Sequence, residues 1–191
     1  MPRQMRAQAH CIGGVLDVDW DISPIEDMFF IRDANTERIN YNEQLRKLAR
    51  NCLTRVDPGF PLKVRQGDIL VGNRGVGWGH GHDHAALALK AVGIGAVLCE
   101  TTGVNFKRNC INHGLPLIEI PGIFSRVTTG DTLEIDLDGG IVRNLSSGFK
   151  QQFVTYPEFI LRILDAGGIY EQMRNEVENE NISARQMEGV L

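Results

Sequence analysis

Apolar residues recur at two different spacings along this chain, and each spacing predicts one kind of element. In residues 42–53, Leu45, Leu48 and Cys52 follow one another at three- and four-residue steps, which predicts an amphipathic helix with one face on the core. In residues 130–142, apolar and polar residues alternate on both sides of an Asp-Gly-Gly turn, which predicts an antiparallel hairpin. The chain is therefore expected to combine helices with strands.

A strand, a helix and a second strand are predicted in close succession in the middle of the chain. Residues 68–71 are a short apolar run, residues 85–91 are rich in alanine and leucine and end near Gly93, and residues 96–99 are apolar again. This order is typical of a βαβ unit with two parallel strands. The same patterns predict further strands at 11–18 and 116–120 and further helices at 105–113 and 153–166. We expect an α/β fold with a mixed sheet and flanking helices.

The length of 191 residues is enough for one hydrophobic core. We expect a single domain over residues 1–170, followed by a polar C-terminal tail at residues 171–191 that is frayed or used in assembly. The formal net charge of −4 gives no reason to expect nucleic acid or an anionic membrane as a partner. The four cysteines are scattered without a CxxC pair, and the N-terminus has no apolar signal segment, so we expect reduced thiols in a cytoplasmic protein.

A glycine-dense loop joins the predicted strand at 68–71 to the predicted helix at 85–91. Gly75, Gly77, Gly79 and Gly81 occupy every second position of this loop. The spacing does not fit the dinucleotide-binding fingerprint, and a Walker A loop is also absent. The glycines let the backbone approach a ligand closely, and the free amides at the start of the following helix favour an anion, either carboxylate or phosphate.

Three histidines in this loop, His80, His82 and His84, raise the question of a metal, because imidazole suits zinc. The run is similar to the H-x-H-x-D-H motif of the metallo-β-lactamase fold, but it is one residue short before the aspartate, and only His113 remains downstream. A catalytic zinc needs at least three correctly placed ligands. We therefore predict no metal bound by this chain.

Three acidic residues, Asp17, Asp19 and Asp21, alternate with apolar ones near the start of the chain. If the strand at 11–18 persists through them, all three carboxylates lie on one face. That face can bind a divalent cation or position a neighbouring loop. The other interpretation is a strand end with solvated acids, and both stay open.

Six separate segments of the chain match motifs that occur together, and in the same order, in one protein family. The likeness covers most of residues 11–170. The family motifs that have counterparts here are IDTD-x-IIP at 16–24, DPxF at 57–60, GDxLVAGxNFGxGSSREHA at 67–85, RNAINxGLP at 108–116, GDxLEVDLxxGxI at 130–141 and PEFxLxILxAGG at 157–168. Six motifs in the right order are far more specific than one. On these motifs the chain resembles the small subunit of 3-isopropylmalate dehydratase, the swivel domain of the aconitase superfamily.

This resemblance implies a swivelling β/β/α domain that works only beside a large subunit. In the family the large subunit holds a [4Fe–4S] cluster, so the cluster is expected in the partner and not in this chain. The substrate class is a small 2-hydroxy di- or tricarboxylic acid or its unsaturated counterpart. The small subunit supplies a base, which removes the proton next to a carboxylate, and an arginine, which binds a substrate carboxylate.

The chain departs from the family in this loop. Aligned on the helix, the family's G-S-S-R-E-H-A falls on Gly79, His80, Gly81, His82, Asp83, His84 and Ala85. His80 therefore replaces the serine that is the family's base, and His82 replaces the arginine. We predict His80 and His82 as catalytic residues, because imidazole titrates near neutral pH. The predicted substrate-binding residues are Gly79, Gly81, Asp83 and His84.

Three interpretations of these replacements remain open. The chain is a working hydro-lyase subunit with a histidine base and an altered substrate, or a subunit that has lost catalysis and serves assembly or regulation, or an ordinary isopropylmalate enzyme. Residues 25–41 do not follow the family's substrate-selecting loop, so the sequence does not identify the acid. Each histidine can also be a loop residue that binds only backbone, and for His84, at the start of a helix, this structural role is a full alternative.

Overall fold

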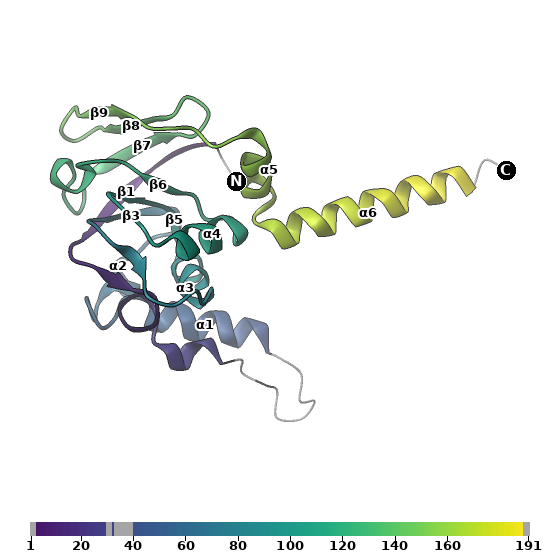
Figure 1. Ribbon diagram of the computed structural model, residues 1–191, viewed down its shortest axis with the longest axis horizontal. Helices are drawn as coiled ribbons and strands as arrows, with labels where there is room; N and C mark the ends of the chain where they lie inside the picture. The colour runs from purple at the N-terminus through teal and green to yellow at the C-terminus, as the bar shows by residue number, and fades with distance from the viewer. Residues whose placement is uncertain (1–2, 30–31, 33–39, 189–191) are drawn as a thin grey trace.

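The computed structural model describes residues 3–29, 32 and 40–188 and is organised around one sheet of seven strands (Figure 1). The strands in chain order are β1 (Gln4–Ile12), β3 (Asp68–Gly72), β5 (Ile94–Cys99), β6 (Leu117–Glu119), β7 (Thr132–Asp136), β8 (Ile141–Asn144) and β9 (Lys150–Gln152). Their order in the sheet is β6-β5-β3-β1-β7-β8-β9. The first four strands of that order are parallel, and the rest pair antiparallel.

Strand β1 lies between the two halves of the sheet and belongs to both. Residues 9–12 pair in parallel with β3, and residues 4–8 pair antiparallel with β7. Every residue of β3 is buried, as expected for a central parallel strand that is covered on both faces. In β7, by contrast, buried residues alternate with partly exposed ones, because only one face of the antiparallel half meets a core.

The helices lie around this sheet and enclose two hydrophobic cores. They are α1 (Tyr41–Asn51), α2 (Phe60–Lys63), α3 (His84–Val92), α4 (Val104–Asn112), α5 (Glu158–Ala166) and α6 (Ile169–Glu188), with 3₁₀ turns η2 (Ile25–Met28) and η3 (Ile123–Arg126) and a π-helical turn η1 (Val18–Ile22). One core joins the parallel strands to α1 and α3 and contains Leu48, Leu70 and Leu89. The other joins the antiparallel half to the parallel strands and contains Leu133 and Val142 together with Val71 of β3.

The predicted βαβ unit and the predicted hairpin are both present. Strand β3, helix α3 and the parallel strand β5 follow one another, and Gly93 ends the helix with φ +115°. Strands β7 and β8 pair antiparallel around the predicted turn. The α/β class with a mixed sheet and flanking helices is confirmed.

Two predicted boundaries are wrong. The first strand is β1 at Gln4–Ile12 and not residues 11–18; its N-terminal half combines polar residues with small alanines, so its apolar face gives a weak signal. The helix predicted over 153–166 begins only at Glu158. Pro157 is its N-cap residue, and proline disfavours the helical conformation of the residue before it.

The C-terminal segment is helical where fraying was one expectation. Helix α6 (Ile169–Glu188) begins just after α5 and runs away from the rest of the molecule (Figure 1). Within the described ranges, none of the helices combines the length and the apolar character that crossing a membrane requires. Most of the segment at 25–41, where the family's specificity loop falls, lies outside the described residues.

Candidate functional site

The site lies where two adjacent parallel strands end. Because β1 and β3 pair in parallel, the segments that follow them leave the sheet at the same edge. These segments also pair with each other, through β2 (Leu16–Asp17) and β4 (Val76–Trp78). The carboxyl edge of parallel strands is where open α/β folds bind ligands. This arrangement brings the acidic segment and the histidine loop together.

Asp19 sits in the π-helical turn η1, and its position is fixed by its neighbours. The Asp17 carboxylate accepts a hydrogen bond from the Asp19 amide, at 2.8 Å from its Oδ1, and caps the turn. Asp21 in turn accepts from the Asp17 amide, at 2.8 Å. The three acids therefore do not share one strand face, because the strand ends at Asp17. The Asp19 side chain is 10% exposed.

The Asp19 carboxylate contacts two histidines from the glycine-rich loop. Nδ1 of His80 lies 2.7 Å from Asp19 Oδ2. Nδ1 of His82 lies 2.9 Å from Oδ1 of the same carboxylate. The two imidazole rings are 5.5 Å apart, tilted by 32°. The His80 side chain is 76% exposed, so its other nitrogen, Nε2, remains available on the surface.

His84 is the buried member of the group. It is the first residue of α3, and it is 3% exposed. Its Nε2 lies 3.2 Å from the Ser23 carbonyl oxygen and 3.8 Å from Asp19 Oδ1. Burial is the main reason why the pKa of His84 is lowered, so its imidazole is neutral at pH 7. The contact with Ser23 agrees with the structural role considered for this residue.

Two features hold the loop in this shape. Gly79 has φ +101°, and a Cβ atom there would collide with the Asp17 carboxylate, so only glycine fits. From α4, the Asn109 side-chain amide donates to the carbonyl oxygens of Gly81 and His82, at 3.1 and 3.0 Å. Asn109 is 8% exposed. The loop is thus positioned from both sides.

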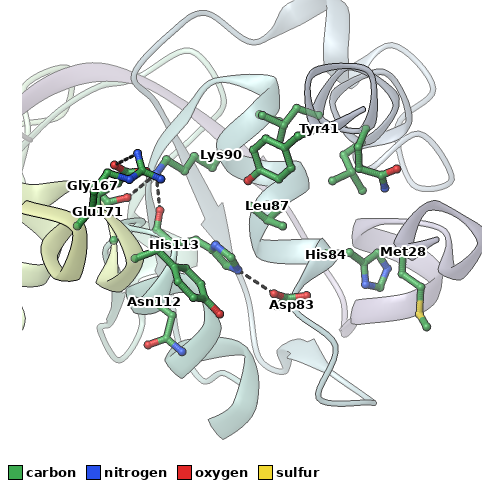
Figure 2. Close-up of a pocket in the computed structure, with 17 residues that line it drawn as sticks. Met28, Tyr41, Asp83, His84, Leu87, Lys90, Asn112, His113, Gly167 and Glu171 are labelled. Carbon is green, nitrogen blue, oxygen red and sulfur yellow. Dashed lines mark hydrogen bonds and ion pairs between the residues drawn. The ribbon is translucent and has the colours of Figure 1, made fainter. Parts of the chain in front are cut away.

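Asp83 and His84 also line a cavity of about 660 Å³ between α1, α3 and the start of α6. Figure 2 shows Asp83 turned toward His113, whose Nε2 lies 3.0 Å from Asp83 Oδ2. This hydrogen bond is the largest of the effects that lower the pKa of Asp83. His80 and His82 do not line this cavity. The structure therefore brings His80, His82 and His84 together and places the Asp83 carboxylate with His113.

The cysteines of this chain do not suit an iron–sulfur cluster. Cys52, Cys99 and Cys110 are buried, and burial raises the pKa of the Cys99 thiol to about 12 and that of Cys52 and Cys110 further. Cluster ligands are thiolates. In the described part of the chain, the only group of three or more potential metal ligands is Asp19, His82 and His84, and it contains no cysteine.

The arrangement is suited to proton transfer next to a carboxylate. A carboxylate that accepts a hydrogen bond from one imidazole nitrogen fixes the orientation of the ring, so the other nitrogen is free to act as a base. The carboxylate also stabilises the imidazolium that forms when the base takes a proton. His80 has this environment. Sequence reasoning recognised Asp19 only as one of three acids, and it overlooked Asn109 and Ser23. The counterparts of the family's IDTD-x-IIP and RNAINxGLP motifs contain all three residues, which was the available signal.

Comparison with known proteins confirms the resemblance found in the sequence. The family described as the aconitase C-terminal domain matches residues 18–122. A relative from Methanocaldococcus jannaschii, named isopropylmalate/citramalate isomerase small subunit, is 43% identical over 131 residues, which cover 69% of this chain and 78% of the relative. A 3-isopropylmalate dehydratase small subunit from Pyrobaculum calidifontis is 42% identical over 128 residues, covering 67% of this chain and 79% of the relative.

The fold agrees with a solved structure over almost the whole chain. The crystal structure of a 3-isopropylmalate dehydratase from Methanocaldococcus jannaschii superposes with a TM-score of 0.77 at 27% identity. The match covers 96% of this chain and 99% of the other. The likeness therefore extends to both halves of the sheet and is not limited to one motif.

Proposed function

Because the chain belongs to the aconitase C-terminal domain family, we propose that it is the small subunit of a two-subunit hydro-lyase with a histidine base. The substrate is a 2-hydroxy di- or tricarboxylic acid. Isopropylmalate and citramalate, for which relatives are named, are dicarboxylic members of this class. The large subunit supplies a [4Fe–4S] cluster, which acts as a Lewis acid toward the substrate hydroxyl. The buried, protonated thiols of the small subunit support the assignment of the cluster to the partner.

The observation that carries the proposal is the contact between His80 and Asp19. Nδ1 of His80 faces Asp19 Oδ2 at 2.7 Å, and the ring is largely exposed. With its proton on Nδ1, His80 has a lone pair on Nε2 that faces outward. In the dehydration direction, His80 Nε2 takes the proton from the carbon next to a carboxylate, a carbon–carbon double bond forms as the C–O bond breaks, and the departing hydroxide takes up a proton from solvent to become water. Asp19 stabilises the imidazolium that results.

The neighbouring residues bind the substrate. His82 stands beside His80 on the same carboxylate and, when protonated, can pair with a substrate carboxylate in place of the family's arginine. This pairing lacks the bidentate geometry of a guanidinium group. The backbone at Gly79 and Gly81 lets the substrate approach closely, and His84 supports the loop from below. The role of Asp83 in substrate binding stays a prediction, and its contact with His113 separates its carboxylate from this group.

Replacement of His80 by alanine tests the proposal. In the enzyme reconstituted with its large subunit, we expect kcat to fall on the order of 10²-fold or more, because a positioned base contributes at least that much. 3-Isopropylmalate and citramalate, the acids named for a relative, are the first substrates to assay. His113→Gln is the matched control, because His113 pairs with Asp83 and not with Asp19.

Full activity of H80A would show that His80 is not the base. If the unaltered enzyme turned over no hydroxy acid, the chain would instead be a subunit for assembly or regulation, the main alternative from the sequence. Co-purification of each variant with the large subunit separates loss of chemistry from loss of assembly. We also propose a cytoplasmic location, which the four unpaired cysteines support.

A further inference from the structure

The acidic segment and the histidine loop, which lie far apart in the sequence, form one cluster in the fold. Asp19, His82 and His84 each offer a ligand atom, and these atoms all lie within 4.8 Å of one another. No metal was predicted from the sequence, because the histidine loop alone lacks a complete set of ligands. The carboxylate that completes the set comes from η1, 63 residues before His82.

The spacing of these atoms is close to that of a metal site. Metal–ligand distances of about 2.0–2.1 Å in tetrahedral geometry place neighbouring ligand atoms roughly 3.3 Å apart. Asp19 Oδ1 lies 2.9 Å from His82 Nδ1 and 3.8 Å from His84 Nε2. Small side-chain movements therefore suffice to admit an ion. The other oxygen, Oδ2, stays with His80, so the ion and the base can share one carboxylate.

The buried surroundings of His84 contain unpaired polar atoms. Among the described residues, three buried side-chain polar atoms have no hydrogen-bond partner, and two of them are Ser23 Oγ and His84 Nδ1. These residues contact each other through the Ser23 carbonyl. Buried polar atoms are normally satisfied, so each exception needs an explanation. Of the two His84 nitrogens, Nε2 is the one near Asp19, and it now contacts the Ser23 carbonyl. An ion bound at Nε2 would therefore replace this contact, while Nδ1 would stay unpaired.

We infer that Asp19, His82 and His84 form a binding site for one divalent transition-metal ion. Two imidazoles and one carboxylate favour Zn²⁺ or Fe²⁺ over Mg²⁺ or Ca²⁺ and leave at least one coordination position open. Hydrogen bonds position two of the ligands before an ion binds. Asp17 caps the turn that carries Asp19, and the Asn109 side-chain amide donates to the His82 carbonyl. Such support is typical of functional metal sites.

The ion would deepen the proposed function by replacing the family's arginine. His82 stands at the arginine position of the family motif, and a bound cation can ligate a substrate carboxylate at its open position. His82 would then contribute as a ligand and not as a charged partner. This role rests on the proposed hydro-lyase function, whereas the binding of the ion does not.

Titration of the purified full-length chain with Zn²⁺, after removal of metals by a chelator, tests the inference. We expect one equivalent to bind by calorimetry, and a large excess of Mg²⁺ not to displace it. With Co²⁺ as the probe, a visible d–d absorption without a thiolate charge-transfer band is expected, since no cysteine belongs to the site.

Variants identify the ligands. His82→Gln and Asp19→Asn should each lose at least about tenfold in Zn²⁺ affinity, whereas H113Q and Cys11→Ser should bind like the unaltered chain. Circular dichroism checks the fold of each variant. Should D19N fail to fold, H82Q keeps the test valid, because the His82 side chain is 38% exposed. Absence of stoichiometric binding, binding that survives H82Q, or binding lost in C11S would each overturn the site.

The two proposals fail separately. The binding measurement needs neither partner nor turnover, so an inactive enzyme would leave the metal site intact. An H80A variant without activity would support the base whether or not Zn²⁺ binds. For the carboxylate-binding role, an enzyme reconstituted from the metal-free small subunit should have a KM for the hydroxy acid at least about tenfold higher than one reconstituted from the Zn²⁺-loaded small subunit, with a smaller change in kcat. An unchanged KM would overturn that role.

Discussion

Asp19 accepts one imidazole on each carboxylate oxygen, and its own amide is held by Asp17. A nearly buried carboxylate needs such partners, because burying a charge without a partner costs roughly several kcal/mol of folding free energy. The histidines therefore stabilise Asp19 as much as Asp19 orients them. This mutual dependence explains how an exposed loop rich in glycine can present imidazoles in fixed positions.

Gly79→Ala tests how strongly this geometry depends on one residue. Gly79 has φ +101°, and a Cβ atom there would collide with Asp17 Oδ2. Alanine would therefore strain the backbone at this position and displace the Asp17 carboxylate that caps the turn. Gly130→Ala is the matched control, because Gly130 has φ +95° and open space around a Cβ atom. We expect the control to lose about 1 kcal/mol of unfolding free energy and G79A to lose more. Urea unfolding measures both, and equal losses would contradict the predicted collision.

At the scale of elements, the site depends on α3 and α4 as well as on the loop. Helix α3 supplies His84 at its first residue, and α4 supplies Asn109. The β5 end adds a further contact, because Thr102 donates through its hydroxyl to the Val76 carbonyl of β4, at 2.7 Å. The glycine-rich loop therefore lies between rigid elements, which limits its freedom even without a ligand.

Asn109→Ala should destabilise the protein by removing two hydrogen bonds at once. The carbonyl oxygens of Gly81 and His82 would lose the buried amide that now satisfies them, at an expected cost of roughly 1–3 kcal/mol. Asn42→Ala, at an exposed position of α1, should stay within about 0.5 kcal/mol of the unaltered chain. Chemical denaturation measures both free energies. If N109A were as stable as N42A, the loop would not be held by α4.

For the whole molecule, the open side of the site suggests where the partner docks. Val15, Trp20 and Trp78 are 63%, 62% and 58% exposed. Trp78 pairs with Asp17 across β2 and β4, so it lies at the rim of the histidine cluster. Tryptophan is enriched among the residues that contribute most to binding in protein interfaces. We expect the large subunit to cover this rim when the site is complete.

Trp78→Ala is expected to weaken association with the large subunit by about 2 kcal/mol, close to thirtyfold in Kd. Val154→Ala is the control, because Val154 is 94% exposed and lies between β9 and α5, in the antiparallel half of the fold. Calorimetry or sedimentation with the isolated subunits measures the difference. The same affinity for both variants would place the interface elsewhere.

The sequence alone was enough to predict the class of fold, the βαβ unit, the hairpin and the family, because these depend on local periodicity and on motifs contiguous in the chain. It failed at the first strand, whose small and polar residues conceal its apolar face, and at the helix that begins only after Pro157. It also predicted the histidine loop as the centre of the chemistry. Which roles these histidines perform remains a prediction.

The side chains that the histidines face became known only from the fold. His80 and Asp19 are 61 residues apart, and no pattern in the sequence predicts that they meet. They meet because β1 and β3 are neighbours in the sheet and run in the same direction, so the segments after them leave at one edge. The same geometry turned Asp83 toward His113 on the other side of α3. Strand pairing is a long-range choice, and no local pattern contains it.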